Sequence, residues 1–166
     1  MRRWRTGLLS AVLCAACGPP PSGLGAAPGF DLPDLAGGKL SLTQLKGKVV
    51  VLDFWAIWCG PCIAEIPAYS SFYARNRSRG VEVVGVVLDS GEPQEIADFV
   101  REQRIPYRQL IGDDKIQGAY GATQGFPTTF VIDGSGTIRQ RILGSAPGKF
   151  DTLQHAVDAA LAEVKS

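Results

Sequence analysis

The chain has 166 residues, of which 45% are hydrophobic and 20% charged, and its formal net charge is +1. This near-neutral balance gives no reason to expect binding to nucleic acid or to an anionic surface. The length from Phe30 to the end fits one domain, and no internal repeat is visible.

The N-terminal segment has the three parts of a bacterial export signal. Arg2, Arg3 and Arg5 are positively charged, a short apolar run covers residues 7–16, and small residues follow it. The run is too short to cross a bilayer as a helix of the mature protein. The sequence therefore predicts a signal peptide over residues 1–16.

Leu13-Cys14-Ala15-Ala16-Cys17 resembles a bacterial lipobox, in which the last cysteine is lipidated and becomes the first mature residue. On this interpretation Cys17 carries a lipid anchor, and residues 17–29, rich in Pro and Gly, form a tether. The alternative is ordinary cleavage near Ala16 or Ala27, which leaves a soluble protein. Both predict an exported bacterial protein on the periplasmic or outer cell-surface side.

The predicted domain, 30–166, opens with a hairpin of residues 30–35 and 39–42, and Gly47 closes a following helical turn. The apolar run from Val49 to Phe54 predicts a strand that is buried on both faces.

Strands and helices then alternate along the chain. Helices are predicted over residues 62–78, 93–104, 115–120 and a final amphipathic segment, and strands over 81–88, 108–111, 128–132 and 137–143. Pro67 is expected to kink or restart the first helix. This order predicts a mixed-sheet α/β sandwich.

Two cysteines separated by two residues, Cys59 and Cys62, lie at the turn between the strand and the first helix. There the N–H groups of a helix N-terminus favour the thiolate. Half of a zinc site is the alternative, but structural zinc needs four ligands, and the sequence holds neither a second pair of this kind nor a nearby histidine. Cys14 and Cys17 belong to the N-terminal segment, so only Cys59 and Cys62 remain in the folded domain. The sequence therefore predicts that these two form a redox-active pair.

Over residues 30–164 the chain resembles the TlpA/ResA-like exported oxidoreductases of the thioredoxin superfamily. The resemblance lies in residues 47–51, in 54–62 with the Trp-Cys-Gly-Pro-Cys motif, and in 125–133. Residues 89–113 are similar to the helix–strand insertion of these exported forms. The resemblance implies a thioredoxin-like α/β fold, with a central mixed β-sheet flanked by helices, an N-terminal hairpin extension and the inserted segment.

In this resemblance Cys59 is the attacking thiolate, and Cys62 resolves the mixed disulfide. Gly60-Pro61 is the pairing of reducing thioredoxins, which favours electron donation. Trp58 is expected to shield one side of the pair, with simple core packing as the alternative.

Two carboxylates are further candidates. Asp53 matches the buried carboxylate of thioredoxins, whose raised pKa lets it exchange a proton with Cys62; the alternative is a solvated charge at a strand end. Glu65 follows Cys62 by one helical turn, on the same face. The resemblance, which includes a Cys-x-x-Cys-x-x-Glu arrangement, implies that Glu65 helps to set the pKa of the thiols. As the alternative, the helix dipole alone favours a Glu in a first helical turn.

Pro127 is expected to be cis, since X-Pro bonds adopt this form far more readily than other peptide bonds. The resemblance implies that it faces the disulfide and presents the backbone of Phe126 to an extended substrate peptide. A trans proline at the start of an edge strand is the alternative. His155, the only histidine, is assigned no chemistry.

The resemblance implies a membrane-tethered thiol-disulfide oxidoreductase that reduces other exported proteins, with apocytochrome c as one substrate class. Its electrons are expected from a membrane thiol transporter, since no flavin or nicotinamide motif is present. No cofactor, metal or nucleic acid partner is expected, and the protein is expected to be a monomer.

Two other functions were weighed against this one. A thiol peroxidase of the peroxiredoxin group needs a Thr shortly before its cysteine, whereas Trp55-Ala56-Ile57-Trp58 carries no hydroxyl. A copper carrier uses cysteines spaced one residue further apart and a histidine in a loop, and His155 lies in a predicted helix.

Overall fold

The computed structural model describes residues 23–164. The predicted signal peptide and Cys17 lie outside these residues. Within the described range, no helix has both the length and the apolar character needed to cross a membrane.

A five-stranded mixed sheet lies at the centre of the domain, in the strand order β5-β4-β3-β6-β7. β4 runs parallel to β3 and to β5, whereas β6 is antiparallel to both β3 and β7. The strands are β3 (Val49–Trp55), β4 (Val81–Val87), β5 (Arg108–Ile111), β6 (Thr128–Ile132) and β7 (Ile138–Leu143). Because β3 lies in the middle and is buried along its whole length, a polar side chain on it is enclosed by the domain.

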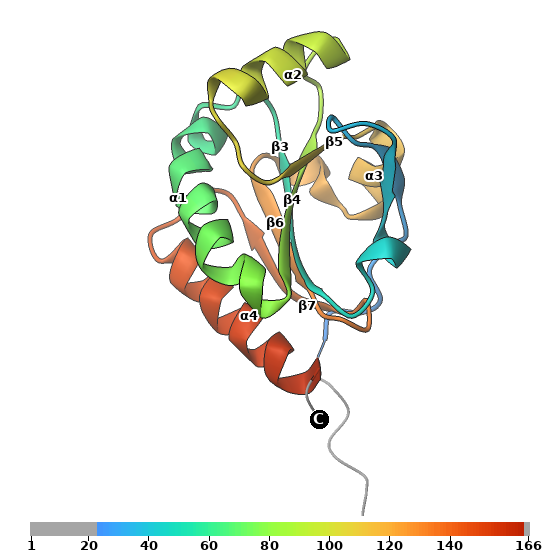
Figure 1. Cartoon of the computed structure of the whole chain (residues 1–166), viewed down its shortest axis with the longest axis vertical. Coiled ribbons are helices and arrows are strands. Elements are labelled where there is room, and N and C mark those ends of the chain that lie inside the picture. Colours follow the sequence, from blue (N-terminus) through green and yellow to red (C-terminus); the bar gives the residue numbers. More distant parts are fainter. Residues whose placement is uncertain (1–22, 165–166) are drawn as a thin grey trace, which may run out of the picture.

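Helices and an N-terminal hairpin cover the sheet (Figure 1). α1 and α4 pack on one face, the hairpin β1–β2 and α3 lie on the other, and α2 lies at the end where the cysteines are found. These elements are β1 (Asp31–Pro33), β2 (Lys39–Ser41), α1 (Gly60–Asn76), α2 (Pro93–Glu102), α3 (Asp114–Ala119) and α4 (Lys149–Val164), with single 3₁₀ turns at Leu42–Leu45, Arg77–Arg79 and Ala122–Gln124.

The side chains of β3 point alternately to the two faces of the sheet, and this alternation determines the face on which Asp53 lies. Val50 and Leu52 pack in the core under the hairpin and α3, whereas Val49 and Val51 pack under α1 and α4. Because successive side chains of a strand point to opposite faces, Asp53 lies on the α1/α4 face. The core under these two helices therefore contains a carboxylate.

The predicted mixed α/β architecture, its N-terminal hairpin and its inserted segment are confirmed. The insertion contributes α2 and β5 between β4 and α3. α1 begins at Gly60, two residues earlier than predicted, because Pro61 suits a first helical turn. The expected restart at Pro67 is wrong, since α1 continues through it.

Residues 24–27, which the sequence assigned to the tether, lie against the start of β7. The N–H of Leu24 donates to the carbonyl of Ile138 and the N–H of Ala27 donates to that of Gly136, each at 2.8 Å. Ala26 also forms a β-bridge with Thr137. The described domain thus extends to residues before Phe30.

Candidate active site

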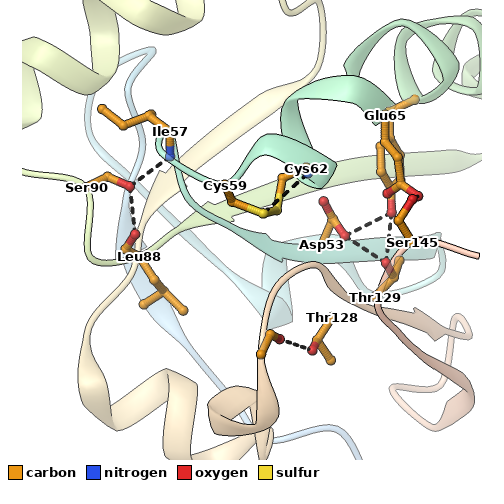
Figure 2. Close-up of a disulfide and its surroundings, with 12 residues drawn as sticks. Asp53, Ile57, Cys59, Cys62, Glu65, Leu88, Ser90, Thr128, Thr129 and Ser145 are labelled. Carbon is orange, nitrogen blue, oxygen red and sulfur yellow. Dashed lines mark hydrogen bonds between the residues drawn. A yellow bond between two sulfur atoms is a disulfide. The ribbon is translucent and has the colours of Figure 1, made fainter.

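Cys59 and Cys62 form a disulfide at the start of α1 (Figure 2). Cys59 is the N-cap residue, and its sulfur accepts a hydrogen bond from the N–H of Cys62 at 3.3 Å. The strand-to-helix turn between β3 and α1 therefore places both sulfurs at the positive end of the helix dipole, which favours a thiolate there.

The two cysteines are almost equally buried, with exposed fractions of 5% and 4%, but they differ in their position relative to a surface hollow. Cys59 borders an open hollow of about 450 Å³, and Cys62 does not. The hollow is lined by Trp58, Gly60 and Pro61 around the start of α1, and by Gln117, Thr123, Gly125 and Phe126 from the segment before β6. None of these residues is charged. Of the two cysteines, Cys59 is therefore the one that borders the hollow, and its surroundings there are uncharged.

Trp58 forms the rim of this hollow. Its side chain is exposed, and its indole N–H donates to the carbonyl of Asp89 at 2.6 Å. Its ring centre lies 5.9 Å from that of Phe126. Core packing, the alternative for Trp58, is therefore wrong, and the indole lies at the surface beside the hollow.

The loop that follows β4 holds the residues just before the cysteine pair. The N–H of Ile57 donates to the hydroxyl of Ser90 at 3.1 Å, and this hydroxyl donates to the carbonyl of Leu88 at 2.7 Å (Figure 2). The inserted segment thus fixes the backbone at Ile57 through Ser90, in addition to the indole of Trp58. Sequence reasoning gave Ser90 no role.

The Phe126–Pro127 peptide bond is cis, so the predicted cis conformation is confirmed and the trans alternative is wrong. The hydroxyl of Thr128 donates to the carbonyl of Gly125 at 2.7 Å and closes this loop onto β6 (Figure 2). Gly125 has a φ of +136°, a backbone conformation that side chains with a Cβ rarely adopt. Gly125 and Phe126 of this loop line the hollow beside Cys59.

Asp53 is buried, so the solvated alternative is wrong. Its Oδ1 atom accepts hydrogen bonds from the hydroxyls of Tyr69, at 2.9 Å, and Thr129, at 2.7 Å. Thr129 lies directly opposite Asp53 in the β3–β6 register. Figure 2 shows the carboxylate between Cys62 and Thr129.

Burial raises the pKa of Asp53 to about 6, because the charged form loses its hydration. The charge of Lys149 and the two hydroxyl donors act in the opposite direction, and the charge of Glu65 adds to the rise. At neutral pH this carboxylate is therefore ionised, yet its proton affinity is high enough to accept a proton from a neighbouring thiol.

Glu65 is buried on α1, one turn after Cys62. Its Oε2 accepts a hydrogen bond from the ammonium of Lys149 at 2.6 Å, and its Oε1 accepts one from the hydroxyl of Ser145 at 2.7 Å. α1 begins at Gly60, so Glu65 lies beyond its first turn, where the helix dipole has little effect. The dipole alternative therefore does not account for a buried ion pair with a residue of α4. The structure thus brings Asp53 and Glu65 into one polar group beneath the cysteines.

Several residues of this site were missed by sequence reasoning, among them Thr129, Tyr69, Ser90 and Lys149. Thr129 carries a signal in retrospect, since it is a polar residue inside an apolar strand, opposite Asp53. Tyr69 lies four residues after Glu65, on the same helix face. Ser90 and Lys149 carry no such signal, because loop serines and helix lysines are ordinarily solvated.

Comparisons with known proteins agree with this geometry. Residues 25–141 match the model of the AhpC/TSA family. The thiol-disulfide oxidoreductase ResA of Bacillus thuringiensis (strain Al Hakam) is 38% identical over 119 residues, which are 71% of this chain and 68% of that protein.

Solved structures are similar over most of the chain. A putative thiol:disulfide interchange protein DsbE from Chlorobium tepidum has a TM-score of 0.77 at 31% identity, covering 84% of this chain and 98% of that one. A secreted Mycobacterium tuberculosis disulfide oxidoreductase, described as homologous to E. coli DsbE, has a TM-score of 0.64 at 27% identity, covering 78% and 95%. The expected thioredoxin-like fold is confirmed.

Proposed function

Because the chain belongs to the AhpC/TSA family of thioredoxin-like proteins and is a ResA/DsbE-like thiol-disulfide oxidoreductase, we propose that it reduces disulfides in other exported proteins. Apocytochrome c is one substrate class. The observation that carries the proposed direction is the buried Asp53 beside Cys62. A nearby proton acceptor helps Cys62 to become a nucleophile, as a reductant requires.

The reaction starts from the dithiol form. The Cys59 thiolate attacks a substrate disulfide, the substrate S–S bond breaks, and one substrate sulfur leaves with the electron pair as a thiolate. Cys62 then gives its proton to Asp53 and attacks the sulfur of Cys59. The bond between Cys59 and the substrate breaks, and the second substrate thiolate leaves. Two electrons pass to the substrate, and the Cys59–Cys62 disulfide seen in the structure forms.

The hollow suits an extended peptide with apolar side chains beside its cysteine. Trp58 and Phe126 offer two adjacent aromatic rings, and no charged residue lines the hollow. The backbone before Pro127 is expected to pair with the substrate as an added strand. Apolar contact and backbone pairing, rather than charge, therefore select the substrate.

The reduction potential of the Cys59–Cys62 pair tests the direction of electron flow. We expect a value near that of thioredoxin, roughly −270 mV, when the full-length protein is equilibrated with defined thiol buffers. A value near that of strong periplasmic oxidants, roughly −120 mV, contradicts the proposal and makes the protein a disulfide donor.

Electrons for a reductant outside the cytoplasm have to cross the membrane, and a membrane thiol transporter is the proposed donor. Export is supported by the N-terminal sequence and by the secreted relative from Mycobacterium tuberculosis. The proposed anchor is a lipid on Cys17, which would keep a monomeric domain near such a donor.

Cys17→Ser tests the anchor. Loss of the lipid should move the protein from the membrane fraction to the soluble fraction of a producing cell, because a chain without acyl groups lacks stable anchoring. Cys14→Ser is the matched control and should leave the protein on the membrane. Equal partition of the wild type and the Cys17 variant contradicts the anchor.

A further inference from the structure

α4 begins with a lysine whose surroundings are unusual. The side chain of Lys149 is 1% exposed, and its ammonium pairs with Glu65 at 2.6 Å. A cation at the first residue of a helix faces the positive end of the dipole, and its burial removes it from water. Apolar residues of the same volume often stabilise a fold as well as a buried ion pair does. Stability alone therefore does not explain this lysine.

Lys149 and Asp53 contact the same aromatic side chain. The Nζ atom of Lys149 lies 5.2 Å from the ring centre of Tyr69, and the Tyr69 hydroxyl donates to Asp53 at 2.9 Å. Glu65 lies one turn before Tyr69 on α1 and adds a negative charge next to the ammonium of Lys149. In the interior of a protein such charges act on one another more strongly than in water.

We propose that Lys149 is a positioning residue of the exchange reaction: paired with Glu65, it sets the pH range over which Asp53 accepts the proton of Cys62. The inference rests on the proposed function, in which Asp53 is that acceptor. A nearby cation favours the carboxylate form of Asp53, and a nearby anion disfavours it. Lys149 is this cation and Glu65 this anion, and the charge of Lys149 has the larger effect on the pKa of Asp53.

The tyrosines near Asp53 stay uncharged over the pH range of the reaction. Burial raises the pKa of Tyr69, from α1, and of Tyr107, from the segment before β5, well above the usual tyrosine value. β6 contributes Thr129, whose hydroxyl does not titrate. The charges that act on Asp53 are therefore those of Glu65, Lys149 and the cysteine pair itself.

The test measures separately the second step of the exchange, in which Cys62 attacks the sulfur of Cys59 in the mixed disulfide. The reduced full-length protein is mixed with less than one equivalent of the aromatic disulfide dithiobis-nitrobenzoate, whose thiolate product is coloured. The first thiolate leaves when Cys59 attacks. The second leaves when Cys62 gives up its proton and displaces the aryl sulfur from Cys59. The rate of this second release is measured against pH, and its midpoint is compared between variants.

The two single variants should move the midpoint in opposite directions. Lys149→Met is expected to move it to higher pH and to slow the second release about tenfold near pH 6, which corresponds to a shift of one pH unit. Glu65→Gln is expected to move it to lower pH. The double variant leaves no buried charge unpaired and should show a smaller upward shift, so it keeps the test decisive where Lys149→Met alone does not fold.

Lys48→Met is the matched control, since Lys48 forms an ion pair with Glu82 on the surface, and its side chain is 48% exposed. Its midpoint should equal that of the wild type. Normal exchange with an unmoved midpoint in Glu65→Gln and in the double variant overturns this inference alone. A wild-type protein that releases no second thiolate overturns the proposed function, and this inference with it.

Discussion

Cys62→Ser is expected to turn the enzyme into a covalent trap. Cys59 lies at the hollow and keeps its helix N-terminus, so it still attacks a substrate disulfide. A serine hydroxyl cannot displace the substrate sulfur, so the mixed disulfide accumulates and turnover falls by at least about a thousandfold. Intact mass measurement of the full-length variant after mixing with an oxidised substrate protein detects the adduct.

Cys59→Ser is the matched variant and should form no adduct, because Cys62 does not line the hollow. It should lose turnover to a similar extent. The opposite pattern, with an adduct on Cys62 and none on Cys59, contradicts the assigned roles of the two sulfurs. The same trap, used in a producing cell, identifies the physiological substrates, because each captured protein carries the cysteine that was attacked.

The fold was largely predictable because its signals are local. The buried strands β3 and β4 are continuous apolar runs, and the turn between β3 and α1 combines a cysteine N-cap with Pro61. The resemblance added the cis conformation of Pro127, for which the residues alone offered only a preference. The edge contact of residues 24–27 was missed, since a Pro- and Gly-rich segment has no pattern that predicts pairing.

The charged part of the site was only half predictable. Asp53 was found because it matches the buried carboxylate of thioredoxins, with apolar neighbours that favour burial. Glu65 was found because it follows Cys62 by one turn, as in the related exported proteins. Their partners were not found, because a hydrogen bond or ion pair across 84 residues, such as that between Glu65 and Lys149, depends on how α1 and α4 pack. The exposure of Trp58 likewise depends on the carbonyl of Asp89, which lies 31 residues further along the chain.

Asp53→Asn should make the oxidised protein more stable at alkaline pH. The pKa of Asp53 is raised from 3.8 to about 6 in the folded state, so the folded protein binds more protons than the unfolded chain between these values. Its stability is therefore highest below the unfolded pKa and is lost as pH rises through the folded one. A shift of this size corresponds to about 3 kcal/mol above neutral pH.

Asp53→Asn removes this loss of stability at high pH, because an amide does not ionise. The variant also keeps a side-chain oxygen that accepts from the hydroxyls of Tyr69 and Thr129. Urea unfolding of the oxidised full-length protein should show the variant to be more stable by about 3 kcal/mol near pH 8, with the difference vanishing near pH 3. Asp31→Asn is the control, since Asp31 forms an exposed ion pair with Lys39, and its effect should stay within about 0.5 kcal/mol at both pH values. A constant difference between Asp53→Asn and the wild type contradicts a raised pKa.

The same variant should resolve mixed disulfides more slowly, because Cys62 then lacks its proton acceptor. A slowing of about a hundredfold near neutral pH lies within the usual contribution of general base catalysis. The two effects have one cause: the burial that raises the pKa of Asp53 weakens the fold and makes the carboxylate a useful base. A variant that gains stability and keeps the wild-type rate of resolution would show that Asp53 is buried for another reason, and the proton of Cys62 would then need a different acceptor.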